Sequence, residues 1–459
     1  MIRKIGAQID SLMAANPRRR YAVLFAVDLL LRIPVILLVM ANHARAVPMG
    51  DSPGYYRLAE NLSQRSVYSQ AYAEPYIPDA ARTPGYPLFV AAVFTAAGPS
   101  LVAVAVAQSL LHGLSGLLVA RLGETWFRSA RIGAAGALLW AVAPVPSVFC
   151  GILLTETLFT PVFLFALLML SEPSLRRAAL AGAALGLGIL IRPIASLVWP
   201  ALLPAFFPGN TWRRALANFA VFSAAAAAVL APWLIRNAAV FGQPALSSVQ
   251  GVNILYNTVS GYIAWRDGLT LGEARDATER MYREYLEERG IQPSNPVEVS
   301  DAQSALAMDI LRSNPIPILW FNAVDSLNGF RPGASYVFIF LSPDTLDSDD
   351  TLEGELSPAM SNLGRPEILL MTLALSAFYV FLFLLAAVGI VSLVRGKKWL
   401  ALMLFGLPAA VLIYLPGISS NARFRIPIEP LLCLLAAAAL SEIIPFLAAR
   451  VRKPSPRQA

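Results

Sequence analysis

The strongest constraint on this chain is a series of apolar segments, each about as long as a membrane-spanning helix. A helix needs about 20 mostly apolar residues to cross a bilayer. Eight segments meet this need, at 21–40, 100–121, 131–149, 151–170, 215–237, 366–394, 399–416 and 423–447. A further stretch, 177–208, is divided into two shorter spans by Arg192-Pro193, because proline interrupts a helix and arginine avoids hydrocarbon. The composition agrees, since only 14% of the residues are charged, against about 25% in soluble proteins.

Basic residues sort these segments across the membrane, because lysine and arginine concentrate on the cytoplasmic side. The clusters are Arg3/Lys4 with Arg18, Arg19 and Arg20, then Arg121/Arg128/Arg131, Arg176/Arg177, Arg213/Arg214, Arg395/Lys397/Lys398 and Arg450/Arg452/Lys453. All of them fall inside if the short apolar segment 84–98 lies on the outer membrane surface. This interpretation predicts an all-α polytopic membrane protein with about ten transmembrane helices and both termini in the cytoplasm. A short tilted span at 84–98 is the alternative.

Two regions, 41–98 and 239–365, are then expected outside the membrane. The first contains Arg82-Thr83-Pro84-Gly85, which predicts a helix with Thr83 as N-cap and Pro84 as its first residue. The second contains helical patterns at Glu273–Arg289 and at Asp301–Ser313, the latter ending at Asn314-Pro315. Its acidic run from Ser342 to Pro358 is interpreted as a solvated loop rather than a divalent-cation site.

Other sequence features narrow the chemistry. The only cysteines are Cys150 and Cys433, in or beside apolar segments, so a disulfide framework is not expected. The only histidines are His43 and His112, which excludes a multi-histidine metal centre. Asp28 and Arg32 lie four residues apart in the first span and share a helix face. We interpret them as a buried pair facing the bundle rather than as catalytic groups.

Four polar features are expected at the same outer membrane level. They are Asp51 with Tyr55 and Tyr56, Arg82 leading to Tyr86, Glu156 at the start of a span, and the arginines Arg192, Arg423 and Arg425. Arginine binds phosphate in a bidentate manner, and a carboxylate can take a proton from an attacking nucleophile. Each feature also has a structural explanation, since arginines snorkel to headgroups, a glutamate complements a helix N-terminus, and Gly50–Gly54 could be only a turn. Their common side favours a site for a phosphate-bearing lipid.

The motifs around these residues resemble the GT-C glycosyltransferases, in particular the protein-mannosyltransferase and aminoarabinose-transferase branch. Gly50-Asp51 followed by Tyr55 is similar to the first-loop signature, and Arg82-Thr83-Pro84-Gly85-Tyr86-Pro87-Leu88 to the basic segment after it. Leu154–Leu158 occupies the place of the second acidic residue. Gly186–Pro193 and Arg236–Pro244 also look like family segments. The resemblance covers most of 20–245 and returns near Arg423–Pro430.

The resemblance implies an inverting transferase that moves a sugar from a polyprenyl-phosphate carrier to a glycan, lipid or protein acceptor. Asp51 would be the general base, and Glu156 would place the acceptor or, in some branches, a metal ion held with Asp51. Arg82, with Arg423 or Arg425, would hold the carrier phosphate, and Tyr55, Tyr56, Tyr86 and Arg192 are further candidate substrate contacts. No cofactor is specified, and a divalent cation stays open. The 239–365 region carries no recognisable peptide- or lipid-A-binding signature, so the acceptor cannot be carried over from the family.

The predicted organisation follows from these assignments. A cytoplasmic segment, 1–20, precedes a transmembrane catalytic region, 21–238, which includes the outer loop 41–98. An extracytoplasmic domain, 239–365, leads to C-terminal transmembrane helices at 366–447 and a cytoplasmic tail at 448–459. We expect a multi-pass protein of a bacterial inner membrane, with its site facing the periplasm and no nucleic-acid partner. The alternative function is a transporter or flippase of lipid-linked sugars, although the uneven division of spans around one large outer domain disfavours related halves. A non-catalytic scaffold in envelope assembly is a third possibility, which leaves the loop acids unexplained.

Overall fold

The chain forms an all-α membrane protein, as the sequence predicts. The computed structural model describes residues 16–47, 50–172, 174–341, 366–416 and 421–451, and no β-strand occurs within these ranges. Four of the described helices are long and apolar enough to cross a membrane: α2 (Pro17–Ala41), α5 (Leu101–Phe127), α11 (Trp212–Phe241) and α19 (Pro366–Arg395).

The remaining predicted spans are shorter helices packed among these four. They are α6 (Ala130–Ala141), α8 (Glu156–Leu170), α9 (Leu175–Ile191), α20 (Trp399–Tyr414) and α22 (Glu429–Val451). The single span expected at 131–149 is wrong in detail, because α6 ends at Ala141 and a separate helix, α7 (Pro144–Phe149), follows. The residue before a proline is disfavoured in helical geometry, which places the break at Ala143.

The predicted interruption at Arg192-Pro193 is confirmed. Helix α9 ends at Ile191, and the chain continues through η2 (Pro193–Leu197), α10 (Val198–Ala201) and η3 (Leu203–Phe206). Helix α9 packs so closely on α11 that a Cβ atom added at Gly182 would lie only 2.0 Å from the carbonyl oxygen of Phe222. Such close backbone approach through small residues is typical of membrane helices.

The polar face of α2 is buried in the bundle, as expected for Asp28 and Arg32. The polar partner of Asp28 is His112 of α5, whose Nδ1 lies 3.0 Å from both carboxylate oxygens. Arg32 donates hydrogen bonds to Ala141 and Ser147 instead. The pair therefore joins α2 to its neighbours and is not a self-contained ion pair.

The first outer loop forms η1 (His43–Ala46), α3 (Ser52–Arg65) and α4 (Gly85–Ala97). Thirteen residues make α4 about 20 Å long, which is shorter than the hydrocarbon core of about 30 Å and supports the surface-helix interpretation. The predicted cap is wrong by one residue. Pro84 is the N-cap, and the Thr83 side chain, which is buried, does not cap the helix. Pro84 already has helix-like backbone angles without making an intrahelical N–H bond, so the first regular residue is Gly85.

The second outer region is helical within the described residues. Its elements are α12 (Val249–Val252), the π-helical turn η4 (Asn253–Val259), α13 (Ser260–Asp267), α14 (Leu271–Arg289), α15 (Pro296–Ser313), α16 (Pro315–Asp325), η5 (Ser326–Phe330) and α17 (Ala334–Leu341). Both predicted helical patterns are confirmed, and α15 ends at Ser313 as expected. The acidic run from Ser342 to Pro358 lies outside the described residues.

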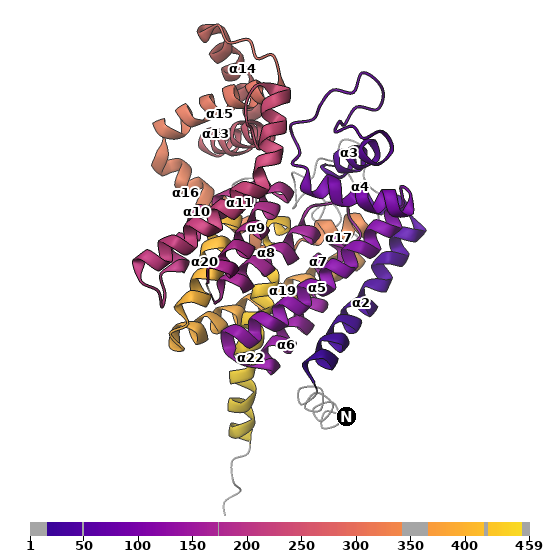
Figure 1. The fold of residues 1–459 in the computed structure, drawn as a ribbon, viewed down its shortest axis with the longest axis vertical. Coiled ribbons are helices and arrows are strands. Elements are labelled where there is room, and N and C mark those ends of the chain that lie inside the picture. Colours follow the sequence, from indigo (N-terminus) through magenta and orange to yellow (C-terminus); the bar gives the residue numbers. More distant parts are fainter. Residues whose placement is uncertain (1–15, 48–49, 173, 342–365, 417–420, 452–459) are drawn as a thin grey trace, which may run out of the picture.

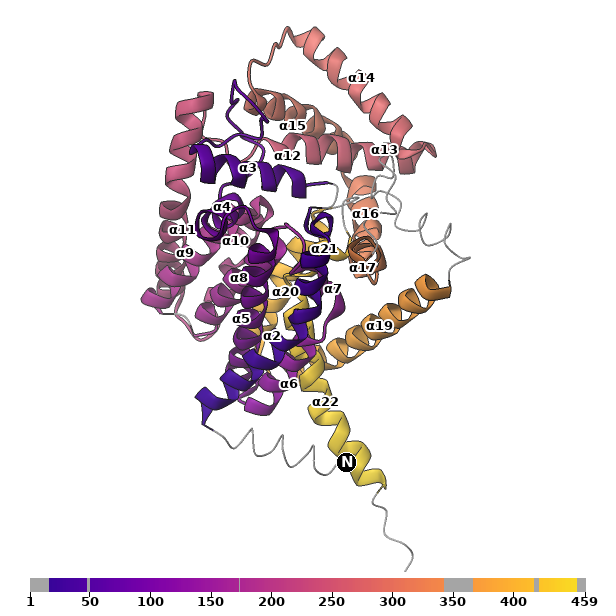
Figure 2. The ribbon, with the colours of Figure 1, turned by 90° about the vertical axis from the view of Figure 1, so that its right-hand side faces the viewer.

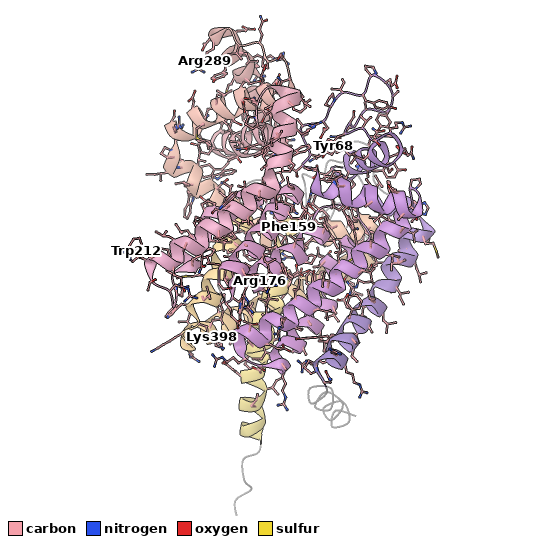
Figure 3. The ribbon with its side chains drawn as sticks, in the orientation of Figure 1. Tyr68, Phe159, Arg176, Trp212, Arg289 and Lys398 are labelled. Atoms are coloured by element: carbon pink, nitrogen blue, oxygen red, sulfur yellow. The ribbon has the colours of Figure 1, made fainter. Side chains whose placement is uncertain are left out.

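The two outer regions lie at the same end of the bundle. Figure 1 shows α13, α14 and α15 beyond one end, with α3 and α4 at that end and the start of α2 at the other. Figure 2 shows α3 and α12 close in height, above α8 and α9. In Figure 3, Lys398 lies far from Arg289 along the long axis, so the basic turn after α19 and the tip of the outer helices are well separated. The first loop, the outer helices and the ends of several spans thus meet at one level.

Candidate active site

Asp51 lies immediately before α3 and is the N-cap residue of that helix. An aspartate in this position commonly bonds the first backbone N–H groups, but the Asp51 side chain makes no such bond. Its Oδ1 accepts a hydrogen bond of 2.6 Å from Arg82, and its Oδ2 accepts one of 2.7 Å from Arg423. The carboxylate therefore points away from its own helix and toward two guanidinium groups.

Arg82 is held in place by the loop that carries it. Its backbone N–H donates to Asp79 over 2.9 Å, and its carbonyl oxygen accepts from the Tyr68 hydroxyl over 2.8 Å. Its guanidinium lies over the ring of Tyr55, 5.3 Å from the centroid. Arg82 thus reaches Asp51 from a fixed backbone, across 31 residues of chain.

Arg423 joins the two carboxylates predicted from the sequence. It lies in the short helix α21 (Ala422–Arg425), and its backbone N–H donates to the side chain of Asn421. Its Nη1 donates to Asp51 and its Nε donates to Glu156. One side chain from the C-terminal part of the chain therefore completes a site begun by residues before 160.

Glu156 is the first residue of α8 and is fully buried. Besides Arg423 it contacts Arg192, which lies at the C-terminal end of α9 beneath the ring of Phe424, 5.3 Å from the centroid. The sequence break at Arg192-Pro193 therefore serves the site, because it lets an arginine leave the helix and face an acid. The resulting order of ionic contacts is Arg82, Asp51, Arg423, Glu156 and Arg192, which we call the ionic chain.

The ionic chain has three guanidinium groups against two carboxylates, so one positive charge is uncompensated within it. This excess suits an anion with a single charge, such as a phosphodiester. A divalent cation fits this arrangement poorly, since Arg423 bridges the two carboxylates that would bind it. Among the residues that the structure describes, no three His, Cys, Asp or Glu side chains gather into a metal-binding group.

The ionic chain also controls the protonation of Asp51. Burial raises the pKa of the Asp51 carboxyl, but the positive charges of Arg423 and Arg82 outweigh burial and hold this pKa below its ordinary value. Asp51 is therefore a carboxylate at neutral pH, which is the form that a general base requires.

The three predicted tyrosines occupy different environments. Tyr55 lies against Arg82, and its ring contacts that of Tyr86 edge-on, with 5.0 Å between centroids. Tyr86 is fully buried and donates to Gln108 over 2.9 Å. Tyr56 packs edge-on against Phe94 of α4, with 5.6 Å between ring centroids. Only Tyr55 directly contacts the ionic chain.

Arg425 lies outside the ionic chain, although Arg423 is only two residues away. It is fully buried and donates to Glu429 over 3.2 Å and to the carbonyl oxygens of Gly329 and Arg331 over 2.8 and 2.7 Å. Its guanidinium also lies 4.2 Å from the ring centroid of Tyr379. These contacts tie Arg425 to the backbone at Gly329 and Arg331, so its role is structural.

Two residues around the site did not emerge from the sequence as site residues. Asp79 bonds the backbone N–H of Arg82, and Arg236 donates to the carbonyl oxygen of Asp79 over 2.9 Å. The signal that could have identified Asp79 is its position three residues before Arg82, since an aspartate side chain can accept a hydrogen bond from a backbone N–H shortly after it in the chain. Arg236 offered no comparable signal, because its contact crosses 157 residues.

Comparison with known proteins gives one family match. Residues 81–235 match the model of the dolichyl-phosphate-mannose-protein mannosyltransferase family. This region contains Arg82, Glu156 and Arg192 but not Asp51 or Arg423. No curated protein matches the sequence.

Solved structures share the fold at low sequence identity. The oligosaccharyltransferase AglB from Archaeoglobus fulgidus, in complex with an inhibitory peptide and a dolichol-phosphate, has a TM-score of 0.51 at 13% identity. The match covers 95% of this chain and 52% of that one, so the chain spans about half the length of this relative. The apo form of the Archaeoglobus fulgidus enzyme gives a TM-score of 0.52 at 15% identity, with 94% and 51% covered.

A third structure is more distant. ArnT from Cupriavidus metallidurans, bound to undecaprenyl phosphate, is 16% identical, and the match covers 95% of this chain and 81% of that one. Its TM-score of 0.40 is too low to add to the argument on fold. The predicted resemblance is nevertheless confirmed by the family match and the archaeal structures: the chain shares the fold of the archaeal oligosaccharyltransferase and resembles the protein-mannosyltransferase family at residues 81–235.

Proposed function

We propose that this protein is a membrane glycosyltransferase that moves a sugar from a polyprenyl-phosphate carrier to an acceptor. The observation that carries the proposal is the position of Asp51 between Arg82 and Arg423. In this proposal, Asp51 is the base and lies next to two guanidinium groups of the kind that binds phosphate. The family match and the shared fold support the same class of reaction, because the archaeal relative is an oligosaccharyltransferase bound to a dolichol-phosphate.

In the proposed reaction, the acceptor attacks the anomeric carbon of the sugar from the face opposite the phosphate. The bond between that carbon and the phosphate oxygen breaks, and polyprenyl phosphate leaves. Asp51 takes the proton from the acceptor as the new bond forms. A single displacement of this kind inverts the anomeric configuration. Phosphate is a good leaving group, so the mechanism needs no general acid.

Arg82 and Arg423 are proposed to bind the carrier phosphate. Both donate to Asp51 in the described arrangement, and their planar guanidinium groups suit two oxygens of one phosphate. The uncompensated positive charge of the ionic chain matches the single negative charge of a phosphodiester. When the phosphate binds these arginines, its negative charge offsets theirs. The pKa of Asp51 then rises, and Asp51 becomes a stronger base.

Glu156 is proposed to orient Arg423 and to help position the acceptor. It is fully buried and contacts both Arg423 and Arg192, so its own charge is already balanced on two sides. Arg192 would keep Glu156 ionised and in place. No step requires a metal ion.

The proposed location is the outer face of a bacterial inner membrane. The two outer regions lie at one end of the bundle, and the basic turn after α19 lies far from them. Because positive charge concentrates on the cytoplasmic side, this separation supports a periplasmic position for the ionic chain. A polyprenyl-linked sugar would then be used after it has crossed the membrane.

Replacing Asp51 with Asn tests the proposed base. Asn keeps the shape of the side chain and removes its ability to accept the acceptor's proton. We expect a loss of about 10²- to 10⁴-fold in the rate of transfer, measured with radiolabelled polyprenyl-phosphate hexoses and pentoses in reconstituted membranes. Asp301→Asn, which changes an exposed acid of α15, is the matched control. Undiminished transfer by Asp51→Asn would exclude Asp51 as the base.

Reversing the charge at Arg423 tests donor binding. Arg423→Glu should raise the KM for the donor and weaken the binding of polyprenyl phosphate by at least tenfold, since one phosphate ligand becomes repulsive. Arg176→Glu alters an exposed arginine at the start of α9 and should leave binding unchanged. Unchanged donor binding by Arg423→Glu would separate this residue from the phosphate. Export of labelled lipid-linked sugar without any transfer would favour the flippase instead.

A further inference from the structure

The segment from Pro315 to Leu341 carries a stripe of exposed apolar side chains. Such a stripe is not expected in an outer domain surrounded by water. Ile316, Leu319, Trp320, Val324 and Leu327 follow one another at spacings of one to four residues and share one side of α16 and η5. All five are exposed, with Ile316 at 78% and Trp320 at 64%. The stretch from Pro315 to Val324 contains no charged residue. An exposed apolar surface of this kind marks a contact with a membrane or another protein.

The lowest part of this segment lies at the depth of the hydrocarbon core. The ring of Phe330, at the end of η5, is 5.4 Å from that of Phe383 in α19. Phe383 precedes Arg395 by twelve residues, so it is at most about 18 Å along the helix from that residue. Arg395 marks one boundary of the membrane, because a charged side chain is costly in hydrocarbon. The core is about 30 Å thick, and η5 therefore lies inside it.

The irregular backbone at this depth is bonded by the protein. Arg425 donates to the carbonyl oxygens of Gly329 and Arg331, and it is itself paired with Glu429. Both charged side chains are fully buried. Backbone that leaves regular α-helical geometry is tolerated at membrane depth only when protein groups satisfy it. Arg425 meets that condition at the end of the 3-10 helix η5.

Both ends of the segment lie where other spans leave the membrane. Near its start, the carbonyl oxygen of Leu319 accepts a hydrogen bond of 3.0 Å from Tyr414, the last residue of α20. At its end, the carbonyl oxygen of Leu341 accepts one of 2.6 Å from Arg45, four residues beyond the end of α2. The chain thus enters and leaves on the same side.

We propose that Pro315–Leu341 is a re-entrant membrane segment whose exposed stripe contacts the lipid chains of the leaflet nearer the outer domain. Helix α16 leads into this leaflet, η5 is the deepest part, and α17 returns the chain to the surface. Lipid is the occupant because the stripe lies beside α19, whose exposed residues include Phe381, and beside the C-terminal end of α20, where the next residue, Leu415, is also exposed. The inference does not depend on the proposed catalytic function.

The segment also touches the site directly. A side chain at Gly333, between η5 and α17, would lie 2.7 Å from Cβ of Ala422, the residue before Arg423. Tyr336 of α17 packs edge-on against Phe149 of α7, with 5.1 Å between ring centroids. The segment that carries the stripe therefore packs against the residue next to Arg423.

Depth measurement with a spin label tests the inference. Leu327→Cys and Glu284→Cys place the label on the stripe and on the exposed face of α14, and the protein with only its buried Cys150 and Cys433 is the labelling control. In nanodiscs of phosphatidylethanolamine and phosphatidylglycerol, we expect the label at 327 to collide with oxygen rather than with a water-soluble nickel chelate. Its collision rate with the chelate should be at least fivefold below that of the label at 284.

Two results would overturn the proposal. Equal access of the chelate to both labels would place the stripe in water. A label at 327 that neither oxygen nor the chelate reaches would indicate another protein as the occupant. Fluorescence of the unlabelled protein provides a check that needs no cysteine. Brominated lipids should quench the wild type more than Trp320→Phe, and equal quenching of the two would also contradict lipid contact.

Discussion

At the scale of single residues, the chemistry of the site depends on how Asp51 is shared between two arginines. An isolated aspartate titrates near pH 4, but the positive charges of Arg423 and Arg82 hold the pKa of Asp51 below its ordinary value despite burial. The carboxylate form is therefore present above the lowered pKa and is lost only as the pH falls through it. We expect kcat/KM for transfer to persist below the pH at which an ordinary aspartate would be half protonated.

Removing one arginine should shift this dependence. In Arg82→Gln the pKa of Asp51 rises, so the acid side of the kcat/KM profile should move to higher pH. The matched variant Arg65→Gln changes an arginine of the same loop region that does not contact Asp51 and should leave the profile in place. A pH profile that stays the same in Arg82→Gln would show that another group controls the acid side. Profiles are best compared over a range in which circular dichroism shows the fold intact.

Sequence patterns located most of these residues but not their pairing. Asp51, Arg82, Glu156, Arg192 and Arg423 could each be singled out by type and membrane level. That Arg423 bridges both acids could not, because this contact depends on how α21 packs against residues more than 260 positions away. Arg425 shows the limit of prediction from residue type. Arg423, two residues earlier, joins the ionic chain, whereas Arg425 pairs with the buried Glu429.

At the scale of elements, the contact between α9 and α11 depends on small residues. A side chain at Gly182 would overlap the backbone of Phe222. We expect Gly182→Val to destabilise the protein by about 1–3 kcal/mol, because the helices must separate to accept the extra atoms. Gly406→Val is the matched control, since no atom lies within 4 Å of the position of a new side chain there. Thermal unfolding in detergent should show a lower midpoint for Gly182→Val alone, and equal midpoints would refute this packing argument.

Apolar length predicted the helices better than their boundaries. The positions of α2, α5, α11 and α19 follow from long, mostly apolar segments, although α5 and α11 extend beyond those segments into charged residues. The break between α6 and α7 and the start of α4 depend instead on prolines, whose effect on one or two residues is difficult to place from composition. The apolar helix α16 lies within a region that is polar on average, so composition alone assigns all of 239–365 to the outside of the membrane.

At the scale of the whole molecule, the orientation of the bundle decides which compartment supplies the acceptor. We expect Ser100→Cys, at the start of α5, to react with a membrane-impermeant maleimide added to intact cells. Arg395→Cys, at the end of α19, should react only after the membrane is permeabilised. Labelling of both positions from outside would mean that an even number of crossings separates them, whereas the predicted spans give an odd number. Labelling of Arg395→Cys alone from outside would show that the orientation is the inverse of the predicted one.

The long separation between Asp51 and Arg423 has a consequence for how the protein is made. The two residues are 372 positions apart, and Glu156 meets Arg423 across 267. During synthesis, Asp51 and Glu156 leave the ribosome long before their common partner. Until α21 has been translated and inserted, both acids must be balanced by Arg82 and Arg192 alone. The ionic chain closes only when nearly all of the helices have assembled, so a chain stalled before residue 423 would be integrated in the membrane yet inert.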